Sequence, residues 1–146
     1  MRRFCCLNEP EWGAEAMQIP KIVSEFREGL AGGKLLVQQC NSCSKPNMWP
    51  RYACPHCQSD NLGWAESGGK GELHSFCVLR QGAPEGFDGD LPYALGVVKL
   101  DEGVQLLVRL EPTGPDDWSG YECDDRVEFV SKEEGRECAL FRRVGG

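Results

Sequence analysis

Cys40-Asn41-Ser42-Cys43 and Cys54-Pro55-His56-Cys57 are two Cys-x-x-Cys pairs separated by the ten residues 44–53. A tight turn in each pair aims two thiolates at one point, and two such turns supply four soft ligands at the corners of a tetrahedron. Four thiolates at about 2.3 Å satisfy Zn²⁺ and leave no position for water. The pattern therefore predicts a structural zinc site with the ligands Cys40, Cys43, Cys54 and Cys57.

The same four residues are compatible with other chemistry. Iron in a rubredoxin-like site uses the same ligand set, so ligand identity alone does not separate it from zinc. Two disulfides or four ordinary thiols are a further alternative. Paired Cys-x-x-Cys motifs at this separation favour a metal over both of these.

The composition is typical of a folded protein. Of the 146 residues, 40% are hydrophobic, including four Trp, six Phe and three Tyr. No apolar run approaches the ~18 residues of a membrane span, and Glu9, Glu11 and Glu15 come too early for a signal peptide. Nine cysteines, an odd number with four assigned to the metal, indicate a reducing compartment. We expect a cytoplasmic protein that does not associate with membranes.

The net charge of −7 lies entirely in the C-terminal half. Residues 70–146 carry nine basic and sixteen acidic side chains, whereas residues 1–69 carry seven of each. A nucleic-acid-binding surface needs clustered Lys and Arg to neutralise phosphates. The charge distribution therefore argues against a nucleic-acid partner.

An amphipathic helix is predicted from Pro20 to Leu30, after an irregular lead-in of residues 1–19. Proline suits the first helical turn, and a cluster of glycines at 29–33 ends the helix. Ile22, Val23, Phe26 and Leu30 form one apolar face. This face either packs on its own domain or docks on another subunit.

The loop between the two cysteine pairs is the predicted recognition surface. A strand over residues 34–40 delivers the first pair, and residues 44–53 must loop out and return. The large apolar side chains of this loop exceed what covering a metal requires, which is typical of a contact surface. The candidate ligand- or partner-contact residues are Lys45, Trp49, Arg51 and Tyr52.

Residues 61–71 are expected to end the ribbon and to hold a flexible linker at 67–69. Five segments with a period of two follow, and Val104, Leu106, Val108 and Leu110 alternate so regularly that they should face a core. In the long connection 111–125, Trp118 and Tyr121 are expected to be exposed. The strand segments are 73–80, 93–100, 104–110, the region of 127–129, and 138–144.

This order predicts a mainly β protein with an N-terminal helix, a four-cysteine zinc ribbon and a five-stranded Greek-key barrel of the OB type. A fragment of a β-sandwich is the alternative fold. The corresponding divisions are residues 1–33 for the lead-in and helix, 34–69 for the zinc ribbon and 70–146 for the OB-fold barrel.

No residues are arranged for catalysis by this chain alone. His56 lies inside the metal motif, where exposure or a hydrogen bond behind the metal is the commoner role. His74 and Cys77, three residues apart in a predicted strand, should lie on opposite faces and form no dyad. We expect a chain that is not an enzyme on its own.

Several stretches recur in one known family, and they occur here in the same order: Phe26-Arg-Glu-Gly-Leu30, Lys34-Leu-Leu-Val-Gln-Gln-Cys40, Trp49-Pro50-Arg51, Cys54-Pro55-His56-Cys57, Gly71-Glu-Leu-His-Ser-Phe76, Pro92-Tyr93 and Glu102-Gly103. Over roughly residues 20–143 the chain thus resembles the acyl-CoA-associated zinc-ribbon and OB-fold family, first catalogued as a domain of unknown function. It departs from the family pattern at Ser44, where a glycine is common.

The resemblance implies a small non-catalytic subunit of an enzyme that handles CoA thioesters. The implied partner is a large thiolase-like catalytic subunit, as in benzoylsuccinyl-CoA thiolase; related condensing enzymes and hydratases are further partners of the family. The chain would help to bind or shape the site for coenzyme A or acyl-CoA, and Arg51 or Lys45 would meet its phosphates. A nucleic-acid-binding zinc-ribbon and OB module and a rubredoxin-like electron carrier are the alternatives.

Overall fold

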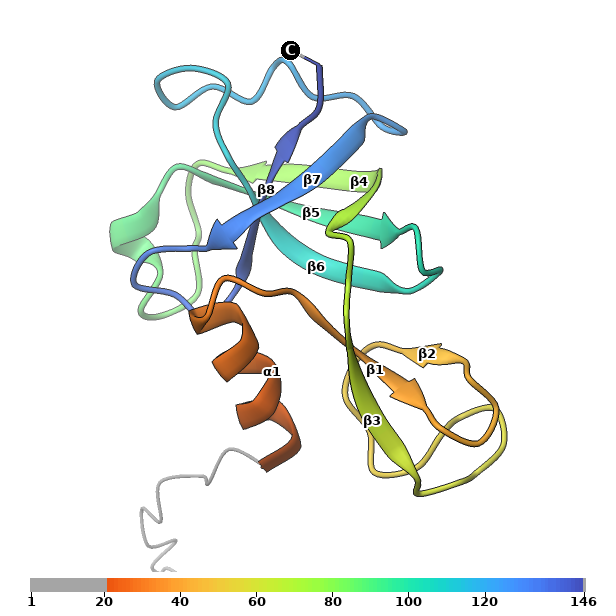
Figure 1. Cartoon of the computed structure of the whole chain (residues 1–146). Helices are drawn as coiled ribbons and strands as arrows, with labels where there is room; N and C mark the ends of the chain where they lie inside the picture. The colour runs from red at the N-terminus through yellow and green to blue at the C-terminus, as the bar shows by residue number, and fades with distance from the viewer. Residues whose placement is uncertain (1–20, 146) are drawn as a thin grey trace, which may run out of the picture.

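The computed structural model describes residues 21–145, and the predicted lead-in of residues 1–19 lies outside this range. Helix α1 (Lys21–Ala31; Figure 1) begins the described part of the chain. It buries Phe26 and Leu30 on the predicted apolar face. The Phe26 ring lies 5.3 Å from that of Trp49 and 6.4 Å from that of Trp64, both in the ribbon. The apolar face of α1 therefore packs on its own chain. None of the described helices has the length and apolarity needed to cross a lipid bilayer.

The ribbon is a three-stranded antiparallel sheet in the order β2-β1-β3. Its strands are β1 (Leu36–Cys40), β2 (Pro46–Asn47) and β3 (Leu62–Glu66). β1 follows α1 after a turn in which Gly33 has a φ of 77°, in the region that favours glycine.

β3 corrects the expectation that residues 61–71 only end the ribbon. Residues 62–66 pair with the whole of β1, from Leu36 opposite Glu66 to Cys40 opposite Leu62. Trp64 anchors the strand, because its Nε1 donates a hydrogen bond of 2.6 Å to the Glu25 carboxylate on α1. This partner is 39 positions away, so it leaves no local pattern.

The Ser67-Gly68-Gly69 segment is not a flexible linker. The Ser67 N–H donates to the Leu35 carbonyl, the Gly68 N–H donates to the Glu102 carboxylate, and the Gly69 carbonyl accepts from the Phe129 N–H. These bonds reach both the ribbon and the barrel. They hold the junction between the two in a defined position.

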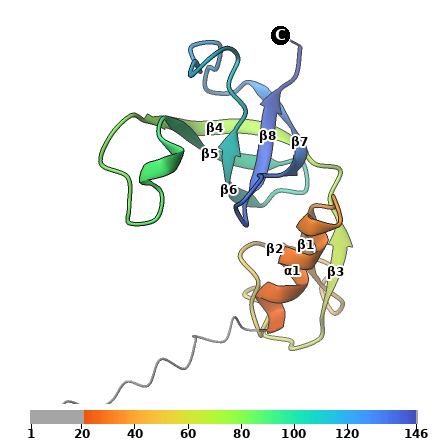
Figure 2. The ribbon, with the colours of Figure 1, turned by 90° about the vertical axis from the view of Figure 1, so that its left-hand side faces the viewer.

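Five strands then close into a barrel in the order β4-β5-β6-β8-β7, and β7 pairs with β4 to complete it. Among the strands of residues 21–145, β6 and β8 form the one parallel pair, as expected of the predicted Greek-key OB-type barrel. Figure 2 shows the barrel at one end of the molecule, with α1 and the ribbon at the other. The strands are β4 (Lys70–Leu79), β5 (Tyr93–Leu100), β6 (Gln105–Leu110), β7 (Arg126–Lys132) and β8 (Ala139–Arg143); a short 3-10 helix, η1 (Asp88–Asp90), precedes β5.

The barrel core confirms the alternation in the sequence. All four apolar residues at positions 104, 106, 108 and 110 are buried. They pack with Leu73, Val98, Val127 and Phe141, each at most 1% exposed. The mainly β fold class predicted from the sequence is therefore correct.

Trp118 and Tyr121, expected to be exposed, are instead 5% and 4% exposed. Trp118 Nε1 donates to the Leu110 carbonyl at 2.9 Å, and the Tyr121 hydroxyl donates to the Glu111 carbonyl at 2.8 Å. Each side chain thus buries its ring and satisfies its polar atom. The connection 111–125 closes one end of the barrel with these two rings.

His74 and Cys77 do not lie on opposite faces, because the pairing of β4 with β5 shifts register between Leu73 and Ser75. The irregularity inserts one residue, and both side chains become exposed. No hydrogen bond joins them among the described residues.

Candidate metal centre and the adjoining cavity

The two Cys-x-x-Cys pairs form two turns with the same hydrogen bonds. The Ser44 N–H donates to the Cys40 carbonyl at 2.8 Å, and the Gln58 N–H donates to the Cys54 carbonyl at 2.9 Å. Ser44 and Gln58 both lie in the left-handed region, with φ of 60° and 63°. The position where glycine is common in the family is thus a left-handed position, and serine occupies it at an energetic cost.

The turns bring the four thiols together as predicted. Their Sγ atoms all lie within 4.8 Å of one another, with 3.6 Å between Cys40 and Cys57 and 3.6 Å between Cys43 and Cys54. A tetrahedron with metal–sulfur bonds of about 2.3 Å has edges of about 3.8 Å. A disulfide would require about 2.05 Å. The donor set and spacing therefore fit a four-coordinate zinc ion.

The local electrostatics favour thiolates at two of the four positions. The backbone N–H of Cys43 holds the pKa of Cys40 below its ordinary value. At Cys54, desolvation raises the pKa, but backbone N–H groups, including that of His56 with its nitrogen 3.4 Å from the sulfur, outweigh it and lower the pKa to about 6.

Cys57 behaves in the opposite way. The Ser59 N–H favours its thiolate, but desolvation and hydrogen bonds with the other three thiols raise its pKa to about 12. Four thiolates this close repel one another in the absence of a cation. A bound Zn²⁺ would remove that repulsion, since metal binding requires and stabilises the deprotonated form.

The loop between the cysteine pairs is held by Gln38 of β1, which is 2% exposed. Its Nε2 donates to the Arg51 carbonyl at 2.9 Å, and its Oε1 accepts from the Arg51 N–H at 3.0 Å. The side-chain amide thus makes the two hydrogen bonds to the Arg51 backbone that a neighbouring strand would otherwise make. This fixes the backbone from which the Arg51 side chain projects.

Arg51 lines a cavity of about 310 Å³ between this loop and the turn that joins β5 to β6. His56 and Asn47 contribute from the ribbon, and Gly103 to Gln105 contribute from the barrel. The other three contact candidates, Lys45, Trp49 and Tyr52, do not line it. Trp49 is 50% exposed and Tyr52 is 73% exposed, so both present apolar surface on the same loop.

Asn47 is a residue that the sequence reasoning missed. It is 3% exposed, and neither its Nδ2 nor its Oδ1 has a hydrogen-bond partner among the described residues. A buried primary amide without partners costs about 1–3 kcal/mol for each unsatisfied group. Asn47 lines the cavity, and a ligand there that offered both a donor and an acceptor would satisfy the amide once its side chain turned toward the cavity. No local pattern distinguishes this asparagine from a turn residue.

Two family models match the chain in the order of the structural units. Residues 27–63 match the rubredoxin-like zinc ribbon domain of ChsH2, and residues 64–132 match the C-terminal OB-fold domain of ChsH2. The zinc ribbon match and the four gathered thiols together support a structural zinc ion.

Two curated proteins are similar to parts of this chain. A DUF35 domain-containing scaffold protein of Methanothermobacter thermautotrophicus is 32% identical over 115 residues, which is 76% of this chain and 80% of that protein. A probable enoyl-CoA hydratase alpha subunit of Thermomonospora curvata is 31% identical over 83 residues, or 57% of this chain. The match spans only 25% of the hydratase subunit.

A solved structure described as the Ltp2-ChsH2(DUF35) aldolase contains a similar chain. The match has a TM-score of 0.73 at 26% identity and covers 86% of this chain and 97% of that one. The two family models place the zinc ribbon before the OB-fold domain, which is the order of the two units in the structure. The chain therefore belongs to the DUF35 family, in which a rubredoxin-like zinc ribbon precedes an OB-fold domain.

Proposed function

We propose that this chain is a non-catalytic accessory subunit of a thiolase-like enzyme. It docks on the large catalytic subunit and helps to bind or shape the site for a CoA thioester. Relatives named scaffold proteins, an aldolase complex and a hydratase subunit support an accessory role beside CoA-handling enzymes. The thiolase type of the partner is our extension of that support.

The observation that carries the proposal is the contrast between the closed metal centre and the open loop beside it. The four thiols would fill the tetrahedron of a bound zinc ion, which would then have no position for a substrate or a water molecule. The adjoining loop exposes Trp49 and Tyr52, and Trp, Tyr and Arg are the residues enriched in binding hot spots. Such a ribbon suits contact with a partner and does not suit independent catalysis.

The cavity beside the loop suits part of a CoA molecule. Arg51 offers a guanidinium for a phosphate, and the unpaired Asn47 amide complements an amide of the pantetheine arm. A cavity of about 310 Å³ is at the lower end of ligand sites and would hold only a segment of CoA. The remainder would lie on the catalytic subunit.

Isothermal titration of the reconstituted complex with CoA tests the role of Arg51. Arg51→Ala should weaken CoA binding about tenfold, and Arg51→Lys should recover part of the loss because the charge remains without the bidentate fork. Lys45→Ala is the comparison that separates the two candidate cations, and it should leave the affinity nearly unchanged because only Arg51 lines the cavity. Unchanged affinity in Arg51→Ala would remove the phosphate role.

The nucleic-acid alternative meets a structural obstacle. OB barrels bind strands between the loops that follow their first and fourth strands, which here are residues 80–92 and 133–138. Arg136 of the second loop forms an ion pair with Asp90 of the first at 2.7 Å. The two loops are thus tied together. Binding of single-stranded DNA at low salt by the purified chain would contradict the accessory role.

A rubredoxin-like electron carrier remains the other alternative. It requires iron in the four-cysteine site. Metal analysis and a visible spectrum of the purified chain distinguish an iron-containing electron carrier from a zinc-containing accessory subunit. One zinc per chain and no visible absorption are expected.

A further inference from the structure

A second cavity, of about 420 Å³, lies at the end of the barrel that the connection 111–125 closes. It shares no lining residue with the Arg51 cavity, and none of the four cysteines lines it. Its apolar walls come from three strands of the barrel and from the connection 111–125. They include Tyr93, Leu110, Trp118 and Leu140.

Arg109 of β6 also lines this cavity and is 3% exposed. Its guanidinium carbon lies 3.5 Å from the centre of the Tyr93 ring, which fixes the plane of the group. Its Nη2 donates to Asp90 at 3.0 Å, and its Nε pairs with Glu133 at 3.2 Å. Its Nη1 is buried and has no hydrogen-bond partner among the described residues.

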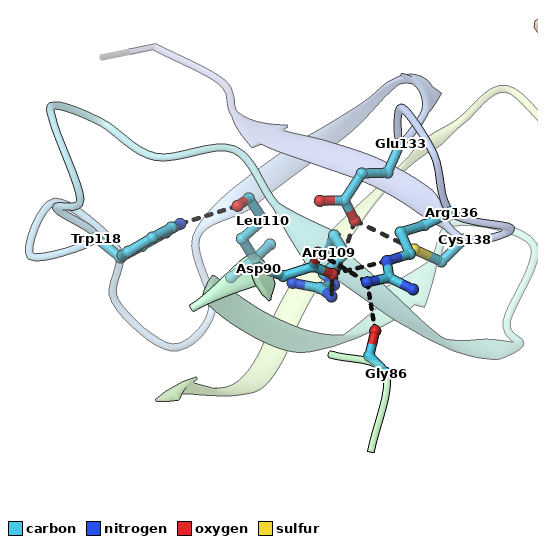
Figure 3. A network of polar contacts seen from close by, with 8 residues as sticks. All are labelled: Gly86, Asp90, Arg109, Leu110, Trp118, Glu133, Arg136 and Cys138. Atoms are coloured by element: carbon cyan, nitrogen blue, oxygen red, sulfur yellow. Dashed lines mark hydrogen bonds and ion pairs between the residues drawn. The ribbon is translucent and has the colours of Figure 1, made fainter. Parts of the chain in front are cut away.

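The two carboxylates that bind Arg109, those of Asp90 and Glu133, also accept hydrogen bonds from other residues (Figure 3). Asp90 also accepts from Arg136 Nε at 2.7 Å and from Arg136 Nη2 at 2.8 Å. Glu133 also accepts from the Cys138 thiol at 3.2 Å. The two arginines and two carboxylates balance in charge. Neither acid therefore needs to turn toward Nη1. Because Nη1 is itself fully buried, a molecule in the cavity would accept its hydrogen bond through a small tilt of the guanidinium.

The walls on the opposite side are rigid. Trp118 is held by its bond to the Leu110 carbonyl, drawn in Figure 3, and the Tyr121 hydroxyl holds the Glu111 carbonyl. Glu111, which is partly exposed, and Asp116, which is exposed, also line the cavity. Neither carboxylate forms an ion pair with any residue from 21 to 145. The cavity thus combines a buried donor, aromatic walls and two unpaired acids.

We propose that this cavity receives a basic, extended segment of the partner polypeptide. A main-chain carbonyl of the segment accepts a hydrogen bond from Arg109 Nη1, and its Lys or Arg side chain pairs with Glu111 and Asp116. The identity of the partner rests on the proposed function, and the site itself rests on the contacts above. A peptide group suits Arg109 because it accepts a hydrogen bond without adding charge to a balanced network.

Charge complementarity selects this occupant. Residues 70–146 carry nine basic and sixteen acidic side chains, so the barrel attracts a basic surface and repels an acidic one. A free carboxylate or phosphate would satisfy Arg109 but would meet Glu111 and Asp116. A Lys or Arg side chain satisfies those acids, and its aliphatic stem suits the aromatic walls.

Peptide titration of the full-length chain, followed by NMR, tests the site without the partner. Acetyl-Leu-Arg-Leu-amide should shift the Trp118 indole N–H and the Leu110 amide signals, and acetyl-Leu-Glu-Leu-amide should bind at least tenfold more weakly. The double variant Glu111→Gln, Asp116→Asn should lose at least tenfold in affinity for the Arg peptide. Glu122→Gln, an exposed acid of the same connection outside the cavity, is the control. Equal binding of the two peptides, or full binding by the double variant, would overturn the site.

The reconstituted complex gives the second measurement. The double variant Glu111→Lys, Asp116→Lys should raise the dissociation constant of the complex at least tenfold, while Glu122→Lys should leave it within twofold. If the complex forms and the double variant binds as the wild type does, the docking inference fails and the accessory role stands. If no CoA-handling subunit assembles with the chain, the accessory role fails, and the peptide titration alone decides whether the cavity binds a basic segment.

Discussion

Gln38 provides a sharp test of how the ribbon positions its loop. Both polar atoms of this buried side chain bind the backbone of Arg51, with N–O distances of 2.9 and 3.0 Å. The substitution Gln38→Met keeps the length of the side chain and removes both bonds. It should therefore destabilise the loop without opening a large cavity in the ribbon.

The magnitude follows from those two bonds. Each is worth about 1 kcal/mol in net stability, and leaving its backbone partner buried and unpaired costs about 1–3 kcal/mol. Arg51 is an exposed residue, so water can reach its freed N–H and carbonyl groups in part. We therefore expect each of the two lost bonds to cost about 1 kcal/mol, which is the lower end of the range for an unpaired group. The total loss in the free energy of unfolding should be about 2 kcal/mol.

Urea unfolding of the zinc-loaded chain, followed by tryptophan fluorescence, measures this loss. The control is Gln39→Met, the neighbouring exposed glutamine, whose Nε2 donates to the Ser44 carbonyl at 3.1 Å. Gln39→Met should cost less than about 0.5 kcal/mol, as is usual at the surface. The reasoning is refuted if Gln38→Met costs no more than Gln39→Met.

Removal of the metal, by a chelator or by Cys43→Ser, should unfold residues 36–66, because metal binding and folding are coupled. Activity of the complex should be lost with the fold of the ribbon. Retained activity would contradict a structural metal. Ser44→Gly should stabilise the zinc-loaded chain by about 1 kcal/mol in urea unfolding, since φ is 60° there; a loss of stability would show that the serine side chain is needed. Tyr121→Phe should cost about 1 kcal/mol, the value of its bond to the Glu111 carbonyl, in the same assay. The Arg136 guanidinium lowers the pKa of Asp90. Stability from this pair is therefore present above the unfolded carboxyl pKa of about 3.9 and is lost as the pH falls through the lower folded pKa. Asp90→Asn should thus flatten the pH dependence of stability below about pH 4, and an unchanged acid limb would argue against the pairing.

The parts of the structure that the sequence predicted depend on short-range patterns. Two Cys-x-x-Cys turns bring their thiols together because each turn is local and the loop of residues 44–53 is short. Strict alternation places Val104 to Leu110 in the barrel core because side chains along a strand alternate between its two faces. The helix at residues 21–31 follows from its own apolar face.

Tertiary structure alone decided the features that depend on residues far apart in the chain. Asp90 meets Arg136 across 46 positions, and Trp64 meets Glu25 across 39, once the barrel closes and α1 packs on the ribbon. Closure of the barrel also turned Trp118 and Tyr121 inward, where the carbonyls of β6 and the residue after it satisfy their polar groups. The unpaired Asn47 amide and Arg109 Nη1 belong to the same class, because whether a polar atom lacks a partner depends on every element packed around it.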